Sequence, residues 1–423
     1  MNTQREGYIA FLRSHRNVLL LCVAIFFSMI GFGMIFPLLP TMAASFNASK
    51  TEIGIVASMF ALTRTILVRP MGALSDSVGR KPMLVWGFVG YGVFMSLFAF
   101  ATNIYMMYFL RAAQGIASAT VWPAASAYIA DSVNPRERGR AMGYMGMATS
   151  VGIMFGPAFG GVLKDLYGIQ IPFLICGLLT GSMAIFIKLM LTETVTVTQE
   201  RPRPRQSARY RTVGWIREDY RELQRNTYAS TLFGVMVAGF IFNFAYALIE
   251  PLLPVFAEES LGATATQVGL AFTVAGAVGA MVRPIAGNLA DTIGRKKPII
   301  VGSLYAGLMM MPLAVVTTPM QMIAVLGARA VGWAVADPAT LALLSDTCDE
   351  RSRGKLFGLY QLSTGLGWML GPLVGGILYD LQGAELSFVF TGAGTLLAGG
   401  ILMYTLKETL MQCDDHEIPG NTL

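Results

Sequence analysis

Charged side chains are scarce in this 423-residue chain. Lysine, arginine, aspartate and glutamate together make up 13% of it, whereas hydrophobic residues make up 54%. An average soluble domain carries about 25% charged residues. The composition therefore argues against a water-soluble fold and, with it, against a soluble enzyme.

Histidine and cysteine are scarce as well. The only histidines, His15 and His416, fall in the terminal regions, so carboxylates are the groups left to exchange protons within apolar segments. The cysteines lack the spacing of metal ligands or of a disulfide framework; they are Cys22, Cys176, Cys348 and Cys413. No Gly-x-x-x-x-Gly-Lys-Ser/Thr loop for the phosphates of ATP is present. We therefore predict no cofactor, no metal site and no ATP-driven mechanism.

Long hydrophobic blocks account for most of the chain. Each is close to the roughly 20 residues that cross a bilayer as a helix. They predict an all-α membrane protein with twelve spans, at about residues 17–39, 52–73, 82–101, 104–128, 141–163, 171–191, 228–256, 265–289, 297–316, 319–345, 355–379 and 387–408. The first block lacks a small-residue cleavage site, so we expect it to stay in the mature protein.

The positions of the basic residues explain the net charge of +6 better than a nucleic-acid partner would. In the predicted topology they lie on one side of the membrane, and positive residues stay on the cytoplasmic side. These residues are Arg5, Arg13, Arg16, Arg80, Lys81, Arg136, Arg138, Arg140, Arg295, Lys296, Lys297, Arg351, Arg353 and Lys355. We predict a multi-pass protein of the bacterial inner membrane with both termini cytoplasmic. The charge indicates contact with anionic lipid heads and not with nucleic acid.

One six-span unit is used twice. The segment GALSDSVGRK at 72–81 returns as GNLADTIGRK at 287–296, and GIMFGPAFGG at 152–161 returns as GWMLGPLVGG at 367–376. Both copies are displaced by the same number of positions, so a duplicated half is the only simple interpretation.

The duplication divides the chain into four parts. Residues 1–191 form an N-terminal six-helix bundle, 192–226 a cytoplasmic linker, 227–410 a C-terminal bundle and 411–423 a disordered tail. Apolar residues at helical spacing in the linker predict an amphipathic helix on the inner membrane surface. A solvated linker without a specific role is the alternative.

These motifs, together with Arg111-x-x-Gln114-Gly115 in the fourth span, resemble the major facilitator superfamily over nearly the whole chain. The Gly-x-x-x-Gly-Pro-x-x-Gly-Gly pattern of the fifth span is similar to that of the superfamily's drug:proton antiporters, although some non-drug exporters carry it. The resemblance implies two pseudo-symmetric six-helix bundles that rock around a central cavity lined by the first, fourth, seventh and tenth helices. We expect a monomer.

Two carboxylates lie within predicted spans, Glu250 in the seventh and Asp337 in the tenth. An ionisable group in hydrocarbon is costly unless it faces a cavity or a partner, so both are candidates for proton coupling. Similar carboxylates occur in these spans of bacterial multidrug antiporters, as the resemblance implies. The alternative is that each pairs permanently with an arginine.

Arg64, Arg111 and Arg329 also lie within spans. Arg111 matches the fourth-helix motif, whose arginine the resemblance implicates in proton transfer. Arg329 lies about one helical turn lower than a repeat copy of Arg111 would, so we expect it to be a local partner of Glu250 or Asp337. Arg64 belongs to no motif; it could snorkel, bind an anionic substrate group or pair with a carboxylate.

The duplicated decapeptide predicts a gate at the cytoplasmic side. In the family fold Asp76 would face the positive start of the eleventh helix near Gly354, and Arg80 would pair with Asp131. Such contacts should release as that side opens; plain topology charges are the alternative. The predicted gate residues are Gly72, Asp76, Gly79, Arg80, Asp131, Gly287, Asp291, Gly294, Arg295 and Asp346, with Arg295 paired to Asp346.

The glycine motif of the fifth span predicts close helix packing. Glycines one turn apart let backbones approach, and a proline bends the helix. We expect the motif to seal the bundle interface against proton leak; packing alone is the alternative. The residues concerned are Gly152, Gly156, Pro157, Gly160 and Gly161, with Gly371 and Pro372 in the second copy.

Aromatic residues near the cavity helices could form an adaptable wall for flat apolar ligands. The candidates are Phe36, Trp122, Tyr246 and Trp333. Such side chains also commonly face lipid or neighbouring helices, which is the alternative for each of them.

The sequence thus predicts a proton-coupled secondary transporter that exports small lipophilic, mainly cationic compounds by alternating access. Its partners would be a small-molecule substrate, protons and membrane lipids. The first alternative is an exporter or flippase of an endogenous anionic or lipid-linked metabolite, which the three arginines favour. A transport-dead sensor is a second alternative, against which the intact motifs argue. Uptake by symport stays open, because topology does not fix the direction of flux.

Overall fold

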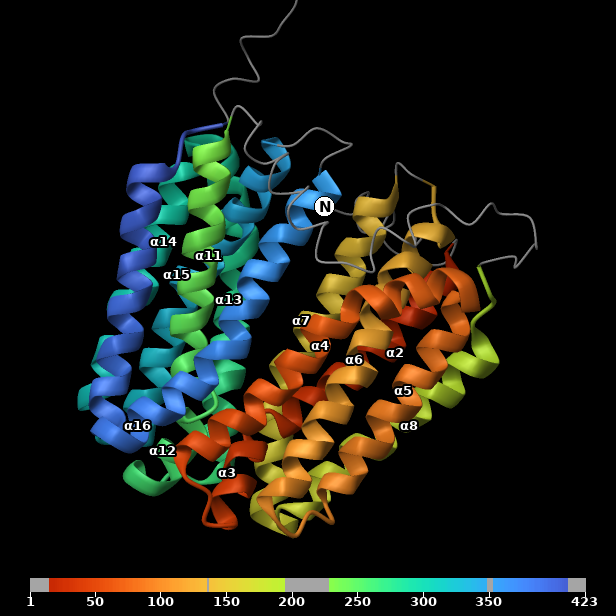
Figure 1. Cartoon of the computed structure of the whole chain (residues 1–423), viewed down its shortest axis with the longest axis horizontal. Helices are drawn as coiled ribbons and strands as arrows, with labels where there is room; N and C mark the ends of the chain where they lie inside the picture. Colours follow the sequence, from red (N-terminus) through yellow and green to blue (C-terminus); the bar gives the residue numbers. More distant parts are fainter. Residues whose placement is uncertain (1–14, 135–136, 195–227, 348–352, 410–423) are drawn as a thin grey trace, which may run out of the picture.

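The computed structural model describes residues 15–134, 137–194, 228–347 and 353–409. Within these ranges every regular element is a helix, and the helices form two bundles that converge at one end and diverge at the other (Figure 1). The predicted linker helix falls almost entirely in 195–227, and the predicted tail is 411–423. Both lie outside the described residues.

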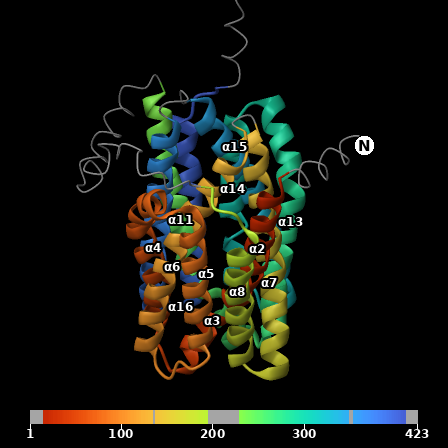
Figure 2. The same cartoon turned by 90° about the vertical axis from the view of Figure 1, so that its right-hand side faces the viewer.

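The first bundle contains seven helical segments that make six spans. They are α2 (Arg16–Ile35), α3 (Leu38–Ser45), α4 (Lys50–Val78), α5 (Arg80–Phe98), α6 (Ile104–Ser132), α7 (Arg138–Tyr167) and α8 (Gln170–Met190). In Figure 2 these helices stand side by side in front of the second bundle.

The second bundle repeats this order. Its segments are α11 (Ala229–Ile249), α12 (Leu253–Leu261), α13 (Ala265–Ile293), α14 (Lys296–Leu308), the 3-10 helix η2 (Met311–Val315), α15 (Pro319–Asp346) and α16 (Arg353–Thr405). The long α16 is two spans joined at Gly383, whose φ of 82° is not helical. Glycine permits that conformation because it has no Cβ.

The structure contains the twelve spans that the sequence predicts. Ten segments of the described chain are long and apolar enough to cross a membrane, and Leu356–Thr405 counts as one of them. Dividing it at Gly383 and adding α6, which carries Arg111 and Gln114 in its interior, brings the number to twelve.

The first and seventh spans are each broken near a proline. The chain leaves α2 at Phe36 and re-forms as α3 after Pro37, and it leaves α11 at Glu250 and re-forms as α12 after Pro251. Proline lacks the N–H that would continue the ladder of backbone hydrogen bonds. Both spans therefore run beyond their predicted ends, to Ser45 and to Leu261.

Helix starts repeat between the halves as well. Ser49 and Glu52 form a capping box at the start of α4, and Thr264 and Gln267 form the same box at the start of α13. Such boxes satisfy two backbone donors of the first turn. The two spans therefore begin at equivalent positions of the two halves.

The bundles meet along two helix pairs, α4 with α16 and α7 with α13, at what we call the closed end. Gly54 of α4 abuts the carbonyl of Pro372, and Gly269 of α13 abuts the carbonyl of Pro157, with no room for a Cβ at either glycine. Small residues allow such backbone contact between helices. At the opposite end, which we call the open end, the bundles stand apart (Figure 1).

Candidate functional site

A cavity of about 1710 Å³ lies between the two bundles. It extends from Leu39 and Ile53 near the closed end to Ala73 and Leu341 toward the open end. The first, fourth, seventh and tenth spans contribute to its wall, as expected, but α4 and α16 contribute many of the residues. These two helices pack against each other across the boundary between the bundles at the closed end, and further along they line the cavity.

The charges on the cavity wall are unequal. Among the described residues that line it, Asp337 is the only acidic one, whereas Arg64, Arg69 and Arg111 are basic. The remaining wall is mainly apolar and aromatic, and it includes Phe36, Trp122 and Trp333 among the predicted aromatic residues. A ligand in this cavity therefore meets apolar rings and a few charges of both signs.

Glu250 is held in a buried cluster behind this wall. Glu250 is 3% exposed. The hydroxyl of Tyr246, one turn earlier in α11, donates to Glu250 Oε1 at 2.7 Å. Arg329 Nη2 lies 3.5 Å from Glu250 Oε2, and its guanidinium stands 4.5 Å from the centre of the Tyr246 ring. A counter-charge and a hydroxyl donor thus offset the free-energy cost of burying this carboxylate. Of the two partners left open for Arg329, the structure places it against Glu250.

Tyr246, the fourth predicted aromatic residue, is not among the residues that line the cavity, and its hydroxyl contacts Glu250 instead. Its ring lies between those of Trp333 and Trp368, with centroid separations of 5.6 Å on each side. The indole of Trp368 in turn donates to Asn243 Oδ1 at 3.0 Å. These contacts fix the direction in which the Tyr246 hydroxyl points.

Arg329 occupies the position in the second half that Gln114 occupies in the first, at the offset of the repeated motifs. Gln114 Nε2 lies 2.9 Å from the sulfur of Met95, and Arg329 Nη1 lies 3.8 Å from the sulfur of Met310, the repeat copy of Met95. The second half therefore has a charge where the first has an amide. Arg329 therefore lies about one turn from the position equivalent to Arg111, because it is the counterpart of Gln114.

Arg111 is buried without a described carboxylate beside it. Its Nη1 donates to Gln114 Oε1 at 2.6 Å, its Nε donates to the Val56 carbonyl at 3.4 Å, and its guanidinium lies 4.7 Å from the centre of the Phe60 ring. A neutral amide, a carbonyl and a ring face thus stabilise this cation.

Asp337 differs from Glu250 in being open to the cavity. Its side chain is 32% exposed, and its polar neighbour is Arg283 of α13, whose Nη2 lies 3.8 Å from Oδ2. A pair this long, with both groups partly exposed, is weak. The sequence did not predict Arg283. The available signal was that it precedes Pro284 within a span, as Arg69 precedes Pro70.

Arg64 lies at the middle of α4, and its side chain is exposed to the cavity. It makes no hydrogen bond or ion pair with any residue that the structure describes. Of the three roles left open for it, pairing with a described carboxylate does not occur in this conformation.

The predicted gate residues lie at the open end. Arg80 contacts Asp76 at 2.5 Å and Asp131 at 3.2 Å, and Arg295 makes the equivalent contacts with Asp291 and, at 3.1 Å, with Asp346. The Asp76 side chain is 67% exposed, so it is not enclosed against α16 here. The pairs of Arg80 with Asp131 and of Arg295 with Asp346 are present although this end is open, because each joins helices of a single bundle and neither crosses between the bundles.

Two further carboxylates hold the gate loops, and the sequence did not predict them. Glu193 accepts from the backbone N–H groups of Arg80 and Lys81, both at 3.1 Å. Glu408, its repeat copy, accepts from those of Arg295 and Lys296 at 2.8 and 3.1 Å. Gly79 and Gly294 begin these turns with φ of 112° and 93°, which other residues adopt only under strain. The gate residues Gly72 and Gly287 lie on the preceding helices α4 and α13.

The glycine motif packs α7 against α2. A Cβ built on Gly152 or Gly156 would come within 2.6 Å of a carbonyl oxygen of α2, and Gly160 is equally close to Met34. Gly161 instead abuts Ala265 of the other bundle. In the second copy Gly371 faces α11 in the same way. The motif therefore serves the close packing of helices, and its ends reach the interface between the bundles.

Charged groups join the bundles at the closed end. Lys50 pairs with Glu259 at 2.7 Å, and Lys164 pairs with Glu258 at 2.6 Å. Asp165 accepts from the backbone N–H groups of Ala265 and Thr266, and Asp380 accepts from those of Lys50 and Thr51. A carboxylate at a helix N-terminus satisfies unpaired donors and the positive end of the helix dipole.

A large cavity between two bundles of membrane-spanning helices, which stand apart at one end, is typical of a membrane transporter. The chain belongs to the Major Facilitator Superfamily, which it matches over residues 21–319 and 235–412. It is a multi-pass membrane transporter and not an enzyme.

Curated relatives cover nearly the whole chain. An uncharacterised transporter of the superfamily from Methanocaldococcus jannaschii is 30% identical over 394 residues, 93% of this chain and 98% of its own. Multidrug resistance protein 2 of Bacillus subtilis is 25% identical over 90% of this chain and 92% of its own. The class E tetracycline resistance protein of Escherichia coli is 30% identical over 86% and 88%.

Solved structures share the fold. A bacterial homologue of the human lysosomal transporter Spinster, inward-facing and unoccupied, superposes with a TM-score of 0.76 at 16% identity, over 96% of this chain and 98% of its own. A human organic anion transporter superposes with a TM-score of 0.66 at 18% identity, over 92% and 99%.

Proposed function

We propose that this transporter exports lipophilic small molecules in exchange for protons, with cationic compounds as its main substrates. The observation that carries the proposal is Asp337, a carboxylate open to a large apolar cavity and the only acidic group among the described residues of its wall. Relatives named for multidrug and tetracycline resistance support the substrate class.

Competition at Asp337 would couple the two fluxes. In a cavity of low dielectric constant, a lipophilic cation and a proton bind the same carboxylate in exchange for one another. The weak contact with Arg283 at 3.8 Å leaves the carboxylate available to either. Arrival of the drug would release the proton, and re-protonation would release the drug.

Protonation of Glu250 would change the contact between α11 and α15. As a carboxylate it holds Arg329 of α15 and Tyr246 of α11 together. Protonation removes the charge that holds Arg329, so the tenth and seventh spans become free to shift relative to each other. This is a second proton site, dry and separate from the drug.

The conformation described here would face the cytoplasm. The open end carries Arg80, Lys81, Arg295 and Lys296, and positive residues favour the cytoplasmic side. Rocking would bring Asp76 and Asp291 against the opposite bundle and break the contacts of Asp165 and Asp380. Exchange of one proton for one monovalent cation moves no net charge, so the pH difference drives it, with about 1.4 kcal/mol, or roughly tenfold concentration, per pH unit. A second proton carried on Glu250 would add about 2.3 kcal/mol from a potential of about 100 mV.

The experiment is ethidium transport by the purified protein in liposomes with an acidic lumen, which should accumulate the dye. A protonophore should abolish accumulation, and Asp337→Asn should do so without loss of folded protein. Glu137→Gln, which changes a partly exposed carboxylate at the start of α7, is the matched control and should transport normally. Undiminished accumulation with the protonophore present would refute proton coupling.

A second candidate function is export of an anionic compound, because Arg64, Arg69 and Arg111 all line the cavity. Its substrate would be held by arginine and would not compete for Asp337. The same liposomes distinguish the two, since an anion would be transported equally by Asp337→Asn.

A further inference from the structure

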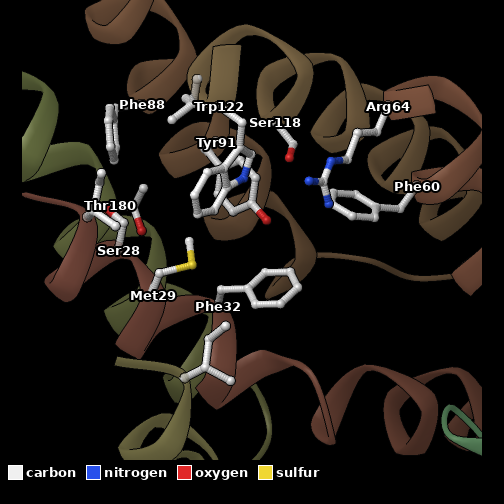
Figure 3. Close-up of a pocket in the computed structure, with 13 residues that line it drawn as sticks. Ser28, Met29, Phe32, Phe60, Arg64, Phe88, Tyr91, Ser118, Trp122 and Thr180 are labelled. Carbon is white, nitrogen blue, oxygen red and sulfur yellow. The ribbon is translucent and has the colours of Figure 1, made fainter. Parts of the chain in front are cut away.

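A second, smaller cavity of about 130 Å³ lies inside the first bundle (Figure 3). Its wall is formed by residues from all six spans of that bundle. Phe32, Phe60, Arg64 and Trp122 line both this cavity and the central one. These four residues therefore form the boundary between the small cavity, which we call the side pocket, and the transport cavity, and we call this boundary the mouth of the side pocket.

The side pocket has the size and lining for one aromatic ring. Phe88, Trp122 and Phe32 surround it together with the aliphatic residues Ile25, Val121 and Ile153. An apolar cavity of about 150 Å³ takes up benzene, so a space of this volume accepts a monocyclic ring and excludes a fused polycyclic one. Aromatic neighbours add favourable ring contacts.

Arg64 supplies an uncompensated positive charge at the mouth. It makes no hydrogen bond or ion pair with a described residue. The acidic residues of the first half that the structure describes all lie at or near helix ends, far along the helices from the middle of α4. They are Glu52, Asp76, Asp131, Glu137, Asp165 and Glu193. A cation that faces the cavity without a counter-charge among these residues can bind an anion from outside the chain.

Polar groups beside Arg64 complete a receptor for an oxyanion. Tyr91 and Ser118 both line the side pocket, and Figure 3 shows Ser118 on its Arg64 side. The hydroxyl of Ser28, buried without a hydrogen-bond partner among the described residues, lies on the side of the pocket away from Arg64 and is not part of this receptor (Figure 3). Hydroxyls can donate to a carboxylate oxygen while arginine binds it as a fork.

We propose that the side pocket is a subsite for an aryl carboxylate, with the ring in the pocket and the carboxylate on Arg64. The ligand would be an organic acid with one ring, or that part of a larger amphoteric molecule whose remainder lies in the transport cavity. This inference rests on the proposed function only in that the ligand enters from the transport cavity. Binding itself requires neither Glu250 nor Asp337.

The test is calorimetric titration of the purified protein in lipid nanodiscs with three probes. Benzoate has ring and charge, formate has the charge alone, and benzyl alcohol has the ring alone. Benzoate should bind saturably and at least tenfold more tightly than either of the others. Arg64→Gln should reduce the affinity for benzoate to that for benzyl alcohol. Arg64→Lys should keep part of the advantage of benzoate over benzyl alcohol. The control Lys188→Gln, at the far end of α8, should bind benzoate as the wild type does.

Two results would overturn the proposal: equal benzoate affinity in Arg64→Gln, or formate binding as tightly as benzoate, which would indicate a site for any small anion. The Glu250→Gln variant keeps the two proposals separate, because it should lose proton-coupled transport and still bind benzoate. If ethidium transport proves independent of protons but benzoate binding depends on Arg64, the transport proposal fails and the subsite stands. If transport is proton-coupled and benzoate binding ignores Arg64, only the subsite fails.

Discussion

Asp165 and Asp380 occupy equivalent positions of the two halves and make the same three contacts across the boundary between the bundles. Asp165 accepts from two backbone N–H groups and the Thr266 hydroxyl at the start of α13, and Asp380 accepts from two backbone N–H groups and the Thr51 hydroxyl at the start of α4. Each carboxylate thus fastens the end of one bundle to the first turn of a helix in the other.

These contacts should set the balance between the two faces of the transporter. Replacing Asp165 and Asp380 by Asn removes two charges from helix N-termini, each worth about 1 kcal/mol, so the ratio of closed to open molecules at this end should fall about fivefold per site. Spin labels at the exposed Tyr105 and Leu381, in a cysteine-free background, report the opening as a longer distance. An unchanged distance distribution in the double variant would show that the contacts do not govern closure.

The buried pair of Glu250 and Arg329 should behave as a unit. Arg329→Gln alone leaves a buried carboxylate without its counter-charge, which typically costs about 3–5 kcal/mol. Adding Glu250→Gln should recover most of that loss, because two neutral amides remain. Thermal unfolding in detergent measures both effects. Additive destabilisation in the double variant would mean that the two side chains are not energetically coupled.

Arg283 should weaken cation binding at Asp337. It lies 3.8 Å from that carboxylate and competes with a positively charged substrate. Arg283→Gln should therefore raise the affinity for ethidium severalfold, on the scale of about 1 kcal/mol for a partly exposed pair. Dye titration by fluorescence anisotropy provides the measurement, with Arg138→Gln as a control at the open end. A fall in affinity would assign Arg283 to substrate binding instead.

The glycine motif offers a matched pair of substitutions on one helix. At Gly156 a Cβ would lie 2.5 Å from the Ile30 carbonyl oxygen, whereas at Gly146 no described atom lies within 4 Å. Gly156→Ala should force α7 away from α2 and cost about 1–3 kcal/mol or more. Gly146→Ala should stabilise the helix by about 0.5–1 kcal/mol. Equal thermal stability of the two variants would contradict the packing seen here.

The parts of the site that sequence analysis could predict follow from one-dimensional periodicity. The duplication fixed the counterparts of Asp76, Arg80 and Asp131, because a repeat at constant spacing places equivalent residues at equivalent depth. The position of Arg329 followed in the same way, since its sequence distance from the repeat copy of Arg111 is close to one helical turn. These inferences required no knowledge of how the helices are rotated.

Rotation and packing explain what sequence analysis missed. Arg283 and Arg69 both precede a proline, but Arg283 is one residue further from its motif glycine, which turns it by about 100° around the helix axis. Whether it reaches Asp337 depends on how α13 sits against α15. The side pocket likewise results from six helices meeting at one depth, and the carboxylates of Glu193 and Glu408 reach their loops only through tertiary packing.

The central claim is that a cation and a proton compete for Asp337, with Glu250 as a second, dry proton site. Proton release on adding ethidium to the purified, unbuffered transporter, followed with a pH-sensitive dye, tests it most directly. The wild type should release protons saturably below neutral pH, Asp337→Asn should release none on dye addition, and Glu137→Gln should match the wild type. Equal release by Asp337→Asn and the wild type would contradict competition at this carboxylate.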